Sequence, residues 1–194
     1  MEKTISEAFS ELVADTRALL ASESARGVLG FPETLATPTP DTFFSSGPEN
    51  APVLVVGHFV DGQERDGLPP GAAGEMLAKM IQHVLGLAPG DVHFLNVMHV
   101  TTPTSMPGYL EFLAATVKRV QPRLIVALGQ SALWANKGPG ANLTANRGKW
   151  TDLAGVPFLP TFHPSFLLAN SEFKRLAFRD LKDVKARLDS LGAV

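Results

Sequence analysis

The sequence predicts an α/β domain of three layers, in which helices cover both faces of a central four-stranded parallel sheet. From residue 52 onward, short apolar runs rich in β-branched residues alternate with longer stretches that repeat at a helical period. Strand–helix–strand units of this kind cross over right-handedly and leave their strands parallel. The length of 194 residues suits one domain, so we assign residues 1–194 to a single unit.

The first 51 residues are expected to pack on this core as a helix followed by an arm. Residues 5–22 place apolar side chains near a helical period. A proline-rich passage follows at residues 32–52, and it cannot continue the helix. We interpret it as an arm of the same domain rather than a linker between two domains.

Four apolar runs predict the strands, at residues 53–57, 92–97, 124–129 and 156–162. The fourth run contains Pro157 and Pro160, which predicts an edge position or an irregular strand because proline cannot donate to a ladder. Amphipathic stretches predict helices at 71–86, at 107–120, from about Ser131, and from Ser171 to Leu191.

Ligands of parallel sheets bind beyond the carboxyl ends of the strands. Those ends hold Gly57, Asn96, Gly129 and His163, so the chemistry is expected there. His93 precedes the core of its strand and is expected to be structural.

Several common sites are excluded or disfavoured. The chain has no cysteine, which excludes disulfides, thiolate nucleophiles and cysteine-bound clusters. Neither a dinucleotide-binding glycine motif nor a phosphate-binding loop occurs. A metal site built from His58, Asp61 and His163 would lack any spacing signature, so we expect no metal. The net charge of -2 gives no general excess of cations for coating nucleic acid.

The sequence shows no signal for a membrane or for secretion. No apolar stretch is long enough to span a membrane, and the first residues lack the order of a signal peptide. We therefore expect a cytoplasmic monomer that does not bind membranes.

Five blocks in this order resemble the uracil-DNA glycosylase superfamily, most closely its family 4 branch. The blocks are residues 53–81, HFLNVMHVTTP at 93–103, RLIVALGQSAL at 123–133, RGKW at 147–150 and PFLPTFHPSFLL at 157–168. The resemblance covers about residues 50–190. It implies a uracil-DNA glycosylase-like fold and a partner DNA that carries a damaged or deaminated base.

The resemblance also implies roles for residues at the strand ends. Asn96 would read the base with its amide, which offers both donor and acceptor, and His163 would stabilise negative charge on the departing base. From the residues alone, a turn-capping Asn96 and a loop-orienting His163 remain alternatives. The remaining candidates are Gly57 and Phe59 for substrate binding, and His58, Asp61 and Glu64 for catalysis.

The residues after His163 would approach the DNA. Pro164 shapes the turn, Ser165 would donate to a phosphate, and Phe166 or Leu167 would enter the gap left by the flipped base. Core packing explains at least one of these two apolar residues equally well. Arg147 and Lys149 are candidate phosphate contacts, although this segment also suits an ordinary exposed turn.

The chain departs from the family pattern at two places. Family 4 members hold an iron–sulfur cluster on four cysteines, and here Val100 and Met106 stand at positions that look like former cluster sites. We therefore expect no iron–sulfur cluster and no other cofactor. In the first motif, His58 occupies a usually acidic position and the usual stacking aromatic is absent, so Phe59 is the candidate replacement.

The leading hypothesis is a glycosylase that flips a uracil or another deaminated base out of DNA and hydrolyses its N-glycosidic bond. An alternative is a binding protein of the same fold that has kept the base pocket and lost hydrolysis, which the altered first motif favours. A hydrolase of free nucleotides or nucleosides is a third hypothesis with less support.

Overall fold

The computed structural model describes residues 43–57, 68, 71–97, 106–138 and 140–192. Their strands form one six-stranded sheet in the order β1-β3-β2-β4-β6-β5. The predicted helix at 5–22 and most of the arm lie outside the described residues.

The four predicted strands form the centre of the sheet and are parallel, as the sequence predicts. They are β3 (His93–Val97), β2 (Val53–Gly57), β4 (Leu124–Leu128) and β6 (Val156–Thr161). Two short antiparallel strands that the sequence analysis missed flank them, β1 (Phe43–Ser46) beside β3 and β5 (Thr151–Leu153) beside β6. Residues 43–46 of the proline-rich arm therefore form an edge strand.

The expectation that the fourth strand lies at an edge or is irregular is wrong, because β6 lies between β4 and β5. Its prolines are tolerated because neither nitrogen occupies a position that requires a donor. Pro157 precedes Phe158, where pairing with β4 begins. Pro160 accepts a hydrogen bond from the Gly148 N–H at 2.8 Å, so its backbone faces away from β4, on the side of β5. Pairing with β5 has already ended at Phe158.

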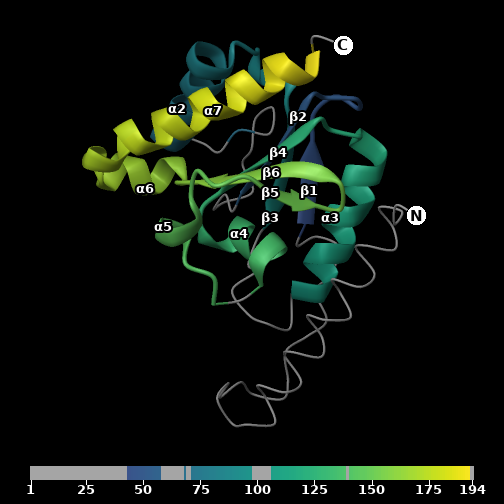
Figure 1. Cartoon of the computed structure of the whole chain (residues 1–194). Coiled ribbons are helices and arrows are strands. Elements are labelled where there is room, and N and C mark those ends of the chain that lie inside the picture. The colour runs from purple at the N-terminus through teal and green to yellow at the C-terminus, as the bar shows by residue number, and fades with distance from the viewer. Residues whose placement is uncertain (1–42, 58–67, 69–70, 98–105, 139, 193–194) are drawn as a thin grey trace, which may run out of the picture.

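Helices cover both faces of the sheet (Figure 1). On one face, α3 (Met106–Val120) and α4 (Gln130–Lys137) pack against alternate strand residues such as Leu54 and Val56. On the other face, α2 (Gly71–Met80), its continuation η2 (Ile81–Leu85) and α7 (Lys174–Gly192) pack against Val53 and Val55. This alternation matches the period of two in a strand and confirms the three-layer fold.

The helix boundaries follow local signals. Gly86 ends the helix of η2 in the left-handed region, at φ +71, where glycine has no steric penalty. The predicted final helix begins as a 3-10 turn, η5 (Ser171–Phe173), and continues as α7. Short elements fill the connections, namely η3 (Pro89–Asp91), α5 (Leu143–Asn146) and α6 (Pro164–Ala169). Among the described residues, no helix combines the length and apolar character needed to cross a bilayer.

Candidate functional site

The ends of the parallel strands bring the predicted Asn96 and His163 to one edge of the sheet. The register aligns Asn96 with Gly57, Gly57 with Leu128, and Leu128 with Thr161, in one row across four strands. Three strand spacings of about 4.8 Å separate the ends of this row by roughly 14 Å. His163 follows Thr161 by two residues.

Asn96 is a buried polar residue within β3, paired through its backbone with β1 on one side and β2 on the other. It lies on the same face of the sheet as Phe94, which packs beneath α2 and α7. Its neighbour in the row is Gly57, which contributes no side chain. An amide side chain can offer both a hydrogen-bond donor and an acceptor.

His163 is the N-cap of α6, and the following Pro164 is the first residue of that helix. Its Nδ1 accepts a hydrogen bond of 3.2 Å from the backbone N–H of Ser165. A neutral imidazole that accepts at Nδ1 carries its proton on Nε2, which is buried here. The cap therefore selects the tautomer in which Nε2 is a donor.

Gly129 lets the end of β4 approach His163 closely. Its N–H donates to the Thr161 carbonyl at 2.9 Å, and its φ is +87. A Cβ at Gly129 would lie 3.2 Å from the His163 Cβ, tighter than ordinary contact. Any larger residue would have to adopt a disfavoured backbone conformation and would also press on the histidine.

A buried polar network fixes the end of β6 just before His163. Arg147 donates from Nε to Asp180 Oδ2 at 2.8 Å and from a terminal nitrogen to Oδ1. Thr161 donates its hydroxyl to the same Asp180 carboxylate at 2.6 Å. Burial raises the pKa of Asp180, while the bonds from Arg147 and Thr161 act in the opposite direction. The network joins α7, β6 and the turn before β5.

This network changes the interpretation of Arg147, which the sequence suggests as a phosphate contact. Its side chain is only 10 % exposed, and the same terminal nitrogen also donates to the Leu176 carbonyl at 3.1 Å. Its guanidinium also lies 5.6 Å from the centre of the Phe162 ring. The geometry therefore favours a structural role for Arg147 over a phosphate contact. Lys149, two residues later, is exposed.

The residues of α6 separate into buried and exposed ones. Pro164 and Leu167 are buried, and Leu167 packs with Phe162 and Ala177. This burial argues against the suggestion that Leu167 enters DNA. Ser165 is exposed, and Phe166 is 39 % exposed with its ring stacked on Phe162 at 5.0 Å.

Four predicted site residues lie outside the described residues: His58, Phe59, Asp61 and Glu64. Their roles stay predictions.

Sequence reasoning also missed residues that hold the site together. Asp180 lies in a helix whose many charges suggest a solvated face, and only its place among the apolar positions of α7 could have marked it as buried. Gln130 donates to the Ala141 carbonyl and accepts from the Leu143 N–H at 3.0 Å, and so anchors the loop after α4. Neither residue belongs to a motif of its own.

An iron–sulfur cluster does not fit this chain. The sequence contains no cysteine to bind it. Within the described ranges, moreover, no group of three or more His, Asp or Glu side chains could hold a metal ion.

Comparison with known proteins shows the family of this chain. Residues 44–182 match the model of the uracil DNA glycosylase superfamily. The chain is 33% identical over 145 residues to the type-4 uracil-DNA glycosylase of Thermotoga maritima, covering 68% of this chain and 75% of that protein. It is 26% identical over 156 residues to that of Sulfurisphaera tokodaii, covering 72% and 71%. It is 27% identical over 161 residues to that of Saccharolobus solfataricus, covering 74% of each. Because the family model matches residues 44–182, most of its length, this chain belongs to the uracil DNA glycosylase superfamily.

Proposed function

We propose that this protein is a DNA glycosylase that excises uracil or another deaminated base from DNA. The observation that carries the proposal is one row of strand ends with Asn96 at one end and Thr161, two residues before His163, at the other. The roughly 14 Å between the ends of this row is wide enough for a pyrimidine ring with a hydrogen bond of about 2.9 Å at each edge.

In the proposed reaction, the nucleotide flips out of the stack so that its base enters this space. Water adds to C1′ of the sugar while the bond between C1′ and the base nitrogen breaks. The bonding electrons leave with the base, and the water proton ends on the released base or on solvent. The enzyme must therefore stabilise negative charge on the departing base.

His163 is suited to this task because the cap occupies Nδ1 as an acceptor, which leaves the ring proton on Nε2 as a donor. A neutral donor beside the base oxygen strengthens its hydrogen bond as that oxygen becomes negative, as in an oxyanion hole. Asn96 would hold the opposite edge of the base. An amide matches the adjacent N–H and carbonyl of uracil, and this pairing would give the selectivity.

On the DNA side, Phe166 is the proposed wedge, with Ser165 and Lys149 as phosphate contacts. Phe166 projects from α6 while Phe162 and Phe173 support its ring at 5.0 and 5.3 Å. A supported aromatic ring can fill the gap in a base stack at a small cost in side-chain entropy.

Residues after β2 would complete the site. Gly57 ends the strand, and Phe59 would stack on the base. Asp61 or Glu64 would orient the water or stabilise the positive sugar, and His58 is the remaining catalytic candidate.

The test is incubation, at enzyme excess, with oligonucleotides containing uracil, hypoxanthine or xanthine, in single and double strands. We expect abasic product from at least one of these substrates, and a rate about 10²–10³-fold lower for His163→Ala, as for removal of one oxyanion donor. Absence of abasic product from all of them would defeat the proposal. Binding of the uracil oligonucleotide without cleavage, abolished by Asn96→Ala, would instead establish the binding-protein alternative.

A further inference from the structure

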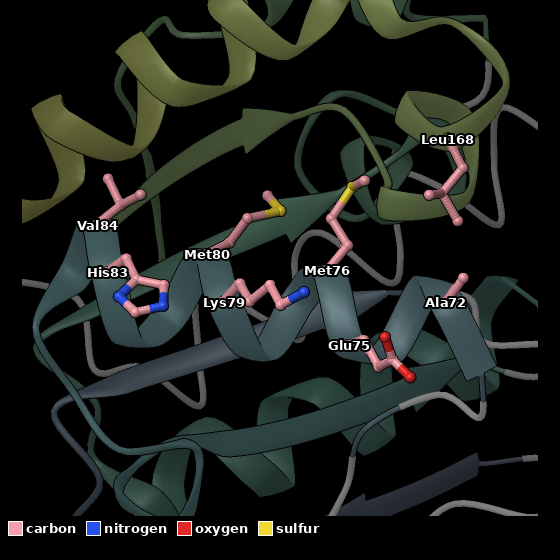
Figure 2. A pocket seen from close by; sticks show the side chains of 8 residues that line it. All are labelled: Ala72, Glu75, Met76, Lys79, Met80, His83, Val84 and Leu168. Carbon is pink, nitrogen blue, oxygen red and sulfur yellow. The ribbon is translucent and has the colours of Figure 1, made fainter.

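An apolar groove runs along α2 and η2, on the side of these helices that faces α6 and α7. Two adjoining cavities of about 410 and 210 Å³ form it, and both are lined by Met76, Met80 and Val84. Figure 2 shows these three side chains along one side of the helix, with Leu168 reaching down from α6 near Ala72. From Ala72 to Val84 the groove is about 18 Å long, at 1.5 Å per helical residue.

The floor of the groove is apolar and adaptable. Leu167, Ala177 and Leu181 line its deeper part together with the two methionines. Methionine side chains are flexible and polarizable, and they are common on surfaces that accept varied apolar partners. Beside this floor, Phe178 is 46 % exposed and Leu168 is 43 % exposed. Contiguous exposed apolar groups of this kind mark interaction sites more often than chance exposure.

The rim of the groove carries an excess of positive charge. Lys79 on α2 and Lys174 on α7 line it, and Lys182 lies 5.0 Å above the Phe178 ring. Glu75 is the acidic residue among the lining residues described. This local excess runs against the net charge of -2 for the whole chain. An apolar floor inside a basic rim is complementary to an acidic segment with apolar side chains.

We propose that this groove binds an acidic peptide segment of another protein, anchored by apolar side chains in the manner of a helix in a groove. The inference goes beyond the proposed glycosylase activity and needs no catalysis. A nucleic-acid backbone would satisfy the lysines but would supply nothing to fill a floor of methionine, valine and leucine. A second copy docking by two-fold symmetry would bring two basic rims together.

The chain allows a direct readout, because it has only five methionines and two of them, Met76 and Met80, line the groove. The protein is labelled at its methionine methyl groups and titrated with a peptide of about 12 residues, with Leu and Phe at the i, i+3, i+4 and i+7 spacing and Glu elsewhere. Binding of the same peptide is measured by fluorescence anisotropy. Controls are the peptide with Ala in place of its anchors and a single-stranded oligonucleotide.

We expect the Met76 and Met80 methyl resonances to shift with the acidic anchored peptide and to shift little with either control. Phe178→Ala and Lys182→Glu should each raise the dissociation constant about tenfold or more, as loss of a central contact does. The matched substitutions Phe44→Ala and Lys118→Glu, at exposed residues of β1 and α3, should leave it unchanged. All four positions are exposed, and thermal melting checks that each variant folds.

Absence of a shift at both methionines would overturn the proposal. So would equal shifts with the oligonucleotide, shifts that depend on protein concentration alone, or binding that survives both groove substitutions. Excision of uracil is measured separately, so failure of the groove proposal and failure of the glycosylase proposal are distinguishable.

Discussion

The Arg147 guanidinium and the Asp180 carboxylate form a buried ion pair that joins α7 to the turn before β5. The Thr161 hydroxyl donates to the same carboxylate, and Thr161 is the last residue of β6 before Phe162 and His163. Asp180 is thus connected to the strand end that presents the candidate base-binding histidine. Its position in α7 ties the outer layer of the fold to the site.

We predict that Asp180→Asn lowers the free energy of unfolding by about 3–5 kcal/mol, because it leaves the buried Arg147 without its counter-charge. Urea denaturation measures the change. The control is Asp189→Asn, which removes the exposed pair between Lys185 and Asp189 and should cost at most about 1 kcal/mol. Similar losses in both variants would contradict a special role for the buried pair.

Gly148 precedes Lys149 and crowds the same carboxylate. It has φ +67, and a Cβ there would collide with Oδ1 of Asp180. Gly155 has φ +86 with nothing within 4 Å of the corresponding Cβ. Gly155→Ala should therefore cost only the left-handed backbone strain of about 1–2 kcal/mol.

Gly148→Ala should cost that strain plus about 1–3 kcal/mol for the overpacked contact, because Arg147 holds the carboxylate in place. Thermal and urea unfolding of the two variants provide the comparison. A Gly148 variant as stable as the Gly155 variant would show that the network can shift to make room.

His93 connects β3 to the segment after β1 through a hydrogen bond. Its Nδ1 donates to the Pro48 carbonyl at 3.1 Å, and its Nε2 faces an Arg119 nitrogen at 3.4 Å. Burial, and then the positive charge of Arg119, lower the pKa of His93, while the backbone bonds and Glu49 oppose this effect. The prediction that His93 is structural agrees with these contacts.

The lowered pKa of His93 predicts a pH-dependent stability. In the unfolded chain His93 binds a proton near pH 6.5, whereas in the folded chain it binds one only at lower pH. This contribution to stability is therefore complete above about pH 6.5 and decreases as the pH falls toward the lower folded pKa. Urea unfolding between pH 7.5 and 5 should show the decrease in the wild type and in His83→Gln, whose histidine is exposed. A decrease of the same size in His93→Gln would contradict the assignment.

The sequence was sufficient to predict the four parallel strands, because each is a short, mostly apolar run in a sheet that helices cover on both faces. It was insufficient for β1 and β5, since three or four residues such as Thr151–Leu153 become a strand only through the neighbour that pairs with them. The prolines of β6 led to the wrong prediction of an edge or irregular strand for a related reason. Whether a missing donor matters depends on which side of the strand is paired at that position.

In the candidate site, too, some features could be predicted from the sequence and others depend on tertiary neighbours. The ends of strands could be read directly, so Asn96 and His163 were found from their order and motifs. The orientation of the side chains on the six-residue helix α6 could not be predicted from the sequence. In the structure, Leu167 is buried while Phe166 and Leu168 are exposed. Asp180 was missed because its partners, Arg147 and Thr161, are distant in sequence.

The exposed ring of Phe166 predicts a difference between DNA substrates. Phe166→Ala should slow excision from a duplex about tenfold or more, because base–aromatic stacking contributes about 1–3 kcal/mol. Excision from a single strand should change less, since no base stack closes over the gap. The matched control is Phe178→Ala, which removes an exposed ring on α7 that has no part in the proposed base site. Equal effects of Phe166→Ala on both substrates would remove the wedge role.

The most direct test of the account is a titration of the protein with free uracil, followed by the NMR signals of the Asn96 side-chain amide and the His163 ring nitrogens. Free base needs neither DNA binding nor hydrolysis, so it reports on the proposed base site alone. We predict that both residues shift with one shared dissociation constant and that Asn96→Ala weakens the response of His163. Shifts of only one residue, or of neither at saturating uracil, would contradict the claim that the two side chains hold a single base.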